Sequence, residues 1–361
     1  MQHNRKISIA KGIGISLMVV GHSPCPAWLG HWIYSFHMPL FFLITGFLFK
    51  EKYLDSPKKF IFNKFKGYYW PFVKWSMIFL IFHNLLAYLN IYQLSYSLKD
   101  FLNKAFYIVS LNGSEQLLGG YWFLIESFFA SLIAFAILFT ITKLISRLKV
   151  PFGKISSIST HKNNLIIGVL ILLLIVAAVL MGENKFLIKI KSSIITASAL
   201  FLIGYLINKN CFRIPTWIAF TFLLMTFGIT YAMDRGLSIH SIGLDLLFLI
   251  PLSLLSILAI LRISENISGW KIGEIMDFIG SNTLMILTFH FLSFKIVNLY
   301  IIFRDDLSIE RLADFASIST DNPYDWILYS VIGISLPLLV VIITKYFRYK
   351  VSRYNLQINN E

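Results

Sequence analysis

The sequence predicts an all-α integral membrane protein with about ten transmembrane helices and both termini in the cytoplasm. Hydrophobic residues make up 57% of the 361 residues and charged residues only 14%, whereas soluble domains have about 45–50% and about 25%. The mean hydropathy is +0.71, and the basic residues stand beside long apolar runs. This composition excludes a soluble cytosolic enzyme and a disordered chain.

Ten apolar segments are the predicted spans. Because a span needs about 20 residues, ten spans use about 200 residues and leave room only for loops. We therefore expect one transmembrane domain over residues 1–361. The segments are 7–24, 32–49, 70–89, 121–142, 164–181, 194–208, 214–233, 241–261, 281–303 and 325–344.

Lys and Arg residues predict the orientation. With the N-terminus inside, 22 of the 32 fall in cytoplasmic segments and 8 in outer loops, as the positive-inside rule requires. The net charge of +14 is thus explained by topology, and we expect no nucleic-acid partner. The basic N-terminus and short apolar run are similar to a signal peptide, but no cleavage motif follows, so we interpret 7–24 as a retained span.

Two outer segments have their own patterns. In the loop after the third span, Leu98, Leu102 and Phe106 recur at helical spacing opposite polar residues, which predicts an interfacial helix in contact with membrane lipid. A loop helix packed on the bundle stays an alternative. The polar segment 304–324 is expected to cap the outer mouth.

Ionisable residues inside spans are costly and need a reason. Most of them fall in the predicted outer half of the membrane. Three interpretations stay open: buried groups that hold helices together, a proton or ion path, and an active site with histidine as general base. The residues concerned are His22, His37, His83, Glu126, Asp245, His290 and Lys295.

The spacing of Lys11 and His22 favours the third interpretation. Eleven helical steps are about 3.06 turns, so both side chains project from one face, roughly 16 Å apart along the axis. This arrangement suits a long ligand with an anionic head, such as coenzyme A, with phosphate near Lys11 and thioester near His22. Lys64 and Lys66, in the basic run before Trp70, are further phosphate candidates. Topological anchoring explains these lysines equally well.

The sequence motifs that mark several other reaction types are absent. The sequence has no Gly-rich nucleotide loop, no Gly-x-Ser-x-Gly elbow and no HExxH. The two cysteines, Cys25 and Cys211, form no metal-binding spacing, so we expect no metal and no permanently bound cofactor.

Several segments together resemble the membrane O-acyltransferases of acyltransferase family 3. Lys11, ten residues and then His22 is similar to the opening motif of the family. Residues 36–42 and 45–47 are similar to its HMPLFF and SG(Y/F) signature, with Thr45 for serine. Weaker matches are Trp122-Phe123-Leu124, the stretch 199–205, and residues 280–284 with His290. The closest likeness is to the small stand-alone branch with fucose 4-O-acetylase-like enzymes. Where the family carries arginines before Pro71, this chain has Lys64 and Lys66, with Gly67 at another usually basic position.

The resemblance implies a multi-pass acetyltransferase of the bacterial inner membrane. It would move acetyl from acetyl-CoA to a sugar hydroxyl of a surface polysaccharide or lipid-linked glycan. His22 would be general base or covalent relay, and His37 would orient His22 or bind the acceptor. Lys11, Lys64 and Lys66 would bind the donor, and Glu126 and His290 would support the histidines or contact the sugar.

Two alternatives belong to other functional classes. A transporter or flippase for a lipid-linked glycan or small anion also explains buried polar residues in ten spans, but it would release no CoA. A membrane scaffold or sensor would use the histidines structurally, so that their loss would lower stability only.

Overall fold

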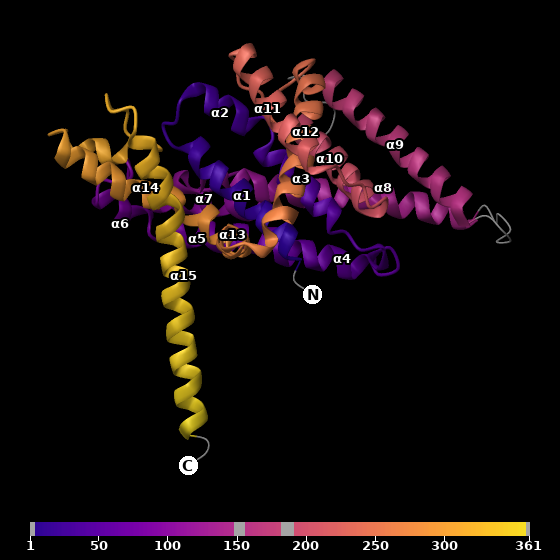
Figure 1. The fold of residues 1–361 in the computed structure, drawn as a ribbon. Helices are drawn as coiled ribbons and strands as arrows, with labels where there is room; N and C mark the ends of the chain where they lie inside the picture. Colours follow the sequence, from indigo (N-terminus) through magenta and orange to yellow (C-terminus); the bar gives the residue numbers. More distant parts are fainter. Residues whose placement is uncertain (1–3, 148–155, 182–190, 359–361) are drawn as a thin grey trace. The chain divides into compact units, whose positions relative to one another are not determined.

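The computed structural model describes residues 4–147, 156–181 and 191–358 (Figure 1). These residues form helices joined by turns and loops, and no strand occurs among them. The chain divides into two compact units, which we call the first and second unit. The first comprises 1–26, 75–121 and 268–361, and the second comprises 27–74 and 122–267.

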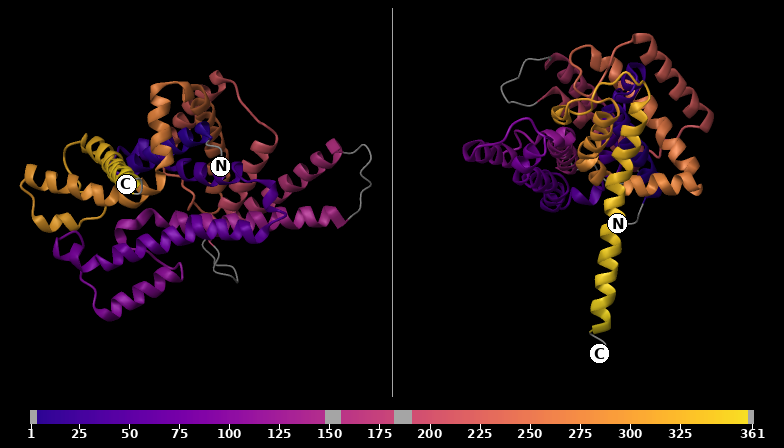
Figure 2. Two further views of the ribbon diagram at one scale, coloured as in Figure 1. Left: turned by 90° about the horizontal axis from the view of Figure 1, so that it is seen from below. Right: turned by 90° about the vertical axis from the view of Figure 1, so that its left-hand side faces the viewer.

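In the first unit, α1 packs against α13, α14 packs against α15, and the short 3-10 helix η3 packs against α14. The C-terminal α15 is one long helix, as Figure 1 and the right-hand view of Figure 2 show. The helices of this unit are α1 (Arg5–His22), α6 (His83–Tyr88), α7 (Leu98–Val109), η3 (Gln116–Tyr121), α13 (Lys271–Ser281), α14 (Thr283–Arg304), η5 (Ile309–Ala313) and α15 (Asp325–Ile358).

In the second unit, α10 is central and packs against α3, α8 and α9, while α11 packs against α12. The helices are α2 (Ala27–Tyr34), α3 (His37–Phe47), η1 (Glu51–Tyr53), α4 (Pro57–Lys64), η2 (Phe65–Tyr69), α8 (Trp122–Arg147), α9 (Ser156–Met181), α10 (Ser192–Lys209), α11 (Thr216–Met233) and α12 (Asp245–Asn266). Helix α5 (Trp70–Ile81) and the short η4 (Ile267–Gly269) begin in this unit and end in the first.

Glycines allow the closest helix contacts in both units. A Cβ on Gly280 of α13 would lie 1.7 Å from the carbonyl oxygen of Ser8 on α1, and one on Gly12 would lie 2.1 Å from that of Met276. In the second unit, a Cβ added to Gly46 of α3 would lie 1.8 Å from a main-chain oxygen, and one added to Gly204 of α10 would lie 2.0 Å from another. Small residues permit such close approach between membrane helices.

Seven helices in the described residues are long and apolar enough to cross a membrane: α8, α9, α10, α11, α12, α14 and α15. They coincide with the last seven predicted segments and confirm a multi-pass membrane protein. The count of ten is not confirmed, and the orientation of the termini stays a prediction.

The first three predicted segments differ from simple spans for local reasons. Helix α1 contains Arg5, Lys6 and Lys11 within its 18 residues. Segment 32–49 is broken before α3, which places Pro39 in the first turn, where its missing N–H costs no hydrogen bond. Segment 70–89 is divided at Phe82 between α5 and α6.

The amphipathic helix expected after the third segment is confirmed as α7. Ser97 caps it, because its hydroxyl oxygen accepts from the amide of Asp100 at 3.3 Å and the Asp100 carboxylate accepts from the Ser97 amide at 3.2 Å. Leu98, Leu102 and Phe106 are all more than half exposed. A contact between this apolar face and lipid stays a prediction.

The charged side chain of Lys295 inside α14 has hydrogen-bond partners. Its ammonium donates to the carbonyl oxygens of Leu312 at 2.9 Å and Asp314 at 2.6 Å. Arg304 at the end of α14 makes two hydrogen bonds with the Asp325 carboxylate, at 2.7 and 2.9 Å. The polar segment 304–324 is thereby fastened to α14 and α15.

Candidate functional site

The first unit brings two of the predicted site histidines together. His22 is the last residue of α1, and His290 lies on α14. Nδ1 of His22 is 3.0 Å from Nε2 of His290. The ring of His22 also stacks on Phe291, with centroids 5.0 Å apart. His290 is completely buried and His22 is half-buried.

The contacts of His290 determine which nitrogen of His22 is basic. Nδ1 of His290 faces the carbonyl oxygens of Ile286 at 3.0 Å and Leu287 at 3.1 Å. A carbonyl oxygen only accepts, so this nitrogen carries the hydrogen. In the neutral ring Nε2 is then an acceptor, and His22 must donate from Nδ1. The lone pair of neutral His22 consequently lies on Nε2.

Helix η3 packs against the histidine pair. A Cβ on Gly120 would lie 2.9 Å from Cδ1 of Leu287 and 4.0 Å from Cε1 of His22, so the bare backbone sits against the ring. The Thr288 hydroxyl donates to the Leu284 carbonyl at 2.6 Å. The adjacent Tyr121 hydroxyl, 2.6 Å from the Thr288 oxygen, therefore donates to it and ties η3 to α14.

Lys11 and His22 lie on one uninterrupted helix, as their predicted common face requires. The ammonium of Lys11 interacts electrostatically with the carboxylate of Asp277 on α13. In the contact between α1 and α13, the Ser8 hydroxyl donates to the Asp277 carbonyl at 3.0 Å and lies 3.1 Å from the Ser281 hydroxyl. The α1–α13 contact thus fixes the helix that carries both residues.

For the acyl transfer that the resemblance implies, we expect His290→Ala to lower kcat by about 10- to 100-fold and to leave KM for the acyl donor nearly unchanged. The variant removes the acceptor of the His22 Nδ1–H, and a hydrogen bond to a group that becomes charged contributes about 1.5–3 kcal/mol. Steady-state kinetics on purified protein with equal thermal stability measures the effect.

His290→Gln is the matched control, because its side-chain oxygen can accept the same hydrogen. We expect it to recover part of kcat and the pH dependence of the wild type. Equal kcat in the wild type and both variants would show that His290 does not position His22.

His37, the other predicted catalytic histidine, belongs to the second unit. It is the first residue of α3, is buried, and directs Nδ1 to the Ile33 carbonyl at 2.8 Å. Nδ1 therefore carries hydrogen, and the lone pair of the neutral ring lies on Nε2. The ring packs edge to face with Tyr34.

The two predicted donor-binding lysines of the second unit have different surroundings. The ammonium of Lys64 lies 5.3, 5.2 and 5.8 Å from the ring centroids of Phe60, Tyr68 and Phe201, a cation–π environment. Burial lowers the pKa of Lys64 to about 8. Lys66 is exposed in the π-helical turn η2, which also contains Gly67.

Glu126 joins three segments of the second unit. One carboxylate oxygen, Oε1, accepts from the Ser193 hydroxyl at 2.9 Å. The same oxygen lies 3.7 Å from Nζ of Lys191 and 4.0 Å from Nδ1 of His240. The carboxylate is 2% exposed. Sequence reasoning singled out Glu126 but not these neighbours, because they follow it by 65 residues or more.

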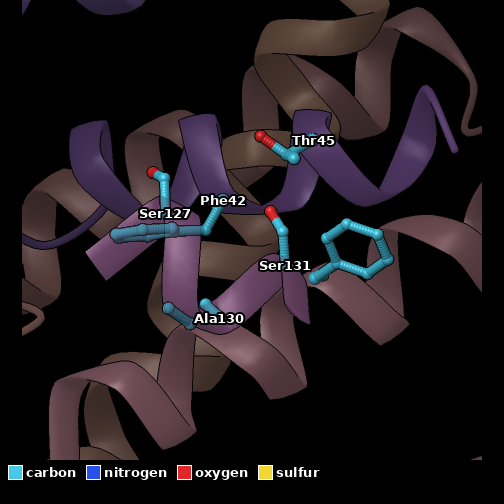
Figure 3. Close-up of a pocket in the computed structure, with 7 residues that line it drawn as sticks. Phe42, Thr45, Ser127, Ala130 and Ser131 are labelled. Carbon is cyan, nitrogen blue, oxygen red and sulfur yellow. The ribbon is translucent and has the colours of Figure 1, made fainter. Parts of the chain in front are cut away.

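A small gap between side chains also lies in this unit (Figure 3). Phe42 and Thr45 of α3 and Ser127, Ala130 and Ser131 of α8 line it, with Ala197 and Phe201 of α10. The gap has no room for a water molecule, so it is too small for an acyl-CoA. We assign no ligand to it.

No group of three or more His, Cys, Asp or Glu side chains with metal-binding geometry occurs in the described part of the chain. The structure adds a buried pair that the sequence did not reveal: Nδ1 of His83 is 2.7 Å from Oε2 of Glu115, and Nε2 is 2.9 Å from the Leu94 carbonyl. Tyr92 and Tyr96 stack on the two sides of this ring.

Sequence comparison gives the family of the chain. No curated protein and no solved structure matches it. A family of membrane acyltransferases, described as an acyltransferase domain, matches residues 4–346, which is nearly the whole chain. The match includes α1 with Lys11 and His22 and α14 with His290. The protein therefore belongs to the membrane acyltransferases of acyltransferase family 3.

Proposed function

We propose that the protein is an O-acetyltransferase of the bacterial cytoplasmic membrane. It transfers acetyl from acetyl-CoA to a sugar hydroxyl of a surface polysaccharide or lipid-linked glycan. Membership of the acyltransferase family supports the reaction class. The observation that carries the proposal is the His22–His290 pair, because it supplies one oriented imidazole with a defined basic nitrogen.

In the proposed reaction, Nε2 of His22 accepts the proton of the sugar hydroxyl as that oxygen attacks the thioester carbonyl carbon. The carbon–sulfur bond then breaks, and the leaving thiolate takes the proton from His22 to give free CoA. During the step His22 is an imidazolium, and its Nδ1–H remains hydrogen-bonded to Nε2 of His290. His290 acts as a positioning residue.

The second route that the sequence leaves open uses His22 as a nucleophile. Nε2 attacks the thioester carbon, and CoA leaves as a thiolate that takes a proton from water. The acetyl-imidazolium then passes its acetyl group to the sugar hydroxyl, whose proton goes to water, and neutral His22 is restored. The hydrogen bond from Nδ1 to His290 leaves Nε2 as the reacting nitrogen in both routes. They differ in whether CoA is released before the acceptor reacts.

Charge supports the assignment of the donor. Lys11, Lys64 and Lys66 carry the positive charges proposed to bind the CoA phosphates. An ammonium attracts phosphate without the two parallel hydrogen bonds of a guanidinium, so the substitution of lysine for the arginines usual in the family preserves the sign of the interaction. His37 is proposed to orient His22 or bind the acceptor.

Release of CoA thiol tests the proposal. Purified protein in nanodiscs receives acetyl-CoA with and without an oligosaccharide fraction from a bacterial surface glycan. We expect acceptor-dependent thiol release for O-acetyl transfer, and a single burst without acceptor if His22 is acetylated. Folded protein that releases no thiol from acetyl-CoA, with or without the oligosaccharides, would contradict the proposed function and favour transport instead.

A further inference from the structure

The cluster around Glu126 has a polar atom that the fold does not satisfy. Oε1 is surrounded by Ser193, Lys191 and His240. Oε2 of the same carboxylate is buried, and no hydrogen-bond donor contacts it in the described residues. A buried acceptor without a partner costs about 1–3 kcal/mol. This unpaired acceptor indicates a donor that the described residues do not supply.

The groups around the carboxyl favour a ligand rich in hydroxyl groups. The ammonium of Lys191 lies 3.7 Å from Oε1 of Glu126. Burial and the charge of Lys191 lower the pKa of His240, which disfavours the imidazolium. The cluster therefore offers acceptors and donors together to a group that can both give and receive hydrogen bonds.

Aromatic surface lies beside these polar groups. The indole of Trp122 meets the His240 ring edge to face, with centroids 4.3 Å apart. Trp122 is half-buried and packs against the core that contains Met38 and Ile239. The side chains of Lys191 and His240 are 67% and 45% exposed. Solvent-exposed polar side chains around a buried carboxyl, with an indole beside them, suit a ligand that has both apolar C–H faces and hydroxyl groups.

We propose that Trp122, Glu126, Lys191 and His240 form a binding site for a neutral, hydroxyl-rich ring such as a pyranose sugar. One sugar hydroxyl donates to Oε2 of Glu126, and neighbouring hydroxyls interact with Lys191 and His240. The predicted topology puts the segments of Lys191 and His240 on the outer face, away from cytoplasmic CoA. The proposal rests on the proposed function only in identifying the ligand as the acceptor sugar.

Saturation-transfer NMR on the full-length protein in nanodiscs tests binding without any turnover. The probes are the neutral methyl glycosides of glucose, fucose and N-acetylglucosamine, with methyl glucuronide as a charged counterpart. We expect transfer to the ring protons of at least one neutral glycoside. Methyl glucuronide should give none, because its carboxylate meets that of Glu126.

Glu126→Gln should weaken the apparent Kd about tenfold or more, since it removes a charged acceptor. His240→Ala, at a half-exposed position where folding is little affected, should also weaken it. Glu51→Gln is the matched control, because Glu51 likewise accepts from a hydroxyl and an ammonium in the same unit, those of Tyr205 and Lys209. It should bind as the wild type does.

The proposal is overturned if no neutral glycoside receives saturation, which would leave an ordered water as the partner of Oε2. It is also overturned if Glu126→Gln and His240→Ala, both folded, bind the sugar as tightly as the wild type. These results are independent of CoA release. A protein that binds sugar but releases no thiol would contradict the proposed function and support the site.

Discussion

Replacing His22 with alanine is expected to reduce acetyl transfer by about 10²–10⁴-fold, the usual contribution of a general acid–base group. The variant removes the nitrogen that accepts the acceptor proton or carries the acetyl group. His22 lies at the end of α1 and is half-buried, so a smaller side chain leaves the α1–α13 contact in place. We expect the thermal stability to change far less than the rate.

The measurement is acceptor-dependent CoA release at equal amounts of monodisperse protein. His31→Ala is the control, because it removes another half-buried histidine, on α2, that has no proposed role in the reaction. A His22→Ala protein that retains wild-type kcat would refute the catalytic assignment. Equal losses of rate and of stability would instead support the structural interpretation of this histidine.

Gly280→Val is expected to have the largest effect on stability. The added Cβ would lie 1.7 Å from the main-chain oxygen of Ser8, 2.7 Å from its carbonyl carbon and 2.8 Å from the nitrogen of Gly12. Main-chain atoms cannot rotate away, so α1 and α13 must separate. Their separation also breaks the hydrogen bond from Ser8 to the Asp277 carbonyl. Overpacking of this kind costs about 1–3 kcal/mol or more.

Size-exclusion chromatography after a temperature series measures the loss of folded protein. Gly228→Val is the matched control, since Gly228 lies within the membrane-crossing helix α11 and a Cβ there meets nothing within 4 Å. The control should behave as the wild type does. Similar melting of Gly280→Val and wild type would show that the close α1–α13 contact is not required.

The sequence predicted the fold best where one apolar run becomes one helix. The last seven predicted spans each coincide with a membrane-crossing helix, and α7 follows the amphipathic pattern of residues 98–109. It predicted less where a few residues redirect the backbone. The break before α3 places Pro39 in a first turn, and the one at Phe82 precedes His83, whose ring is held by Glu115 and Leu94.

In the candidate site, too, the sequence identified single residues but not the contacts between residues that are far apart in the chain. Motifs identified His22 and His290 as separate residues, but their contact joins positions 268 residues apart. The sequence assigned His290 only a supporting role and did not indicate that it would be the neighbour of His22 Nδ1. Likewise, Glu126 was visible as a carboxylate in a span, but Lys191 and His240 gave no signal, because each is an ordinary loop residue in the sequence.

Transfer of an isotopically labelled acetyl group tests the central claim most directly. Acetyl-CoA with a carbon-13 acetyl group is incubated with the nanodisc protein and the surface-glycan oligosaccharides, and the glycan is analysed by NMR and mass spectrometry. We predict label in an alkali-labile ester on a sugar oxygen, formed by the wild type and by His31→Ala but not by His22→Ala. Label that remains in acetyl-CoA or appears only as free acetate, with folded wild-type protein, would contradict the account.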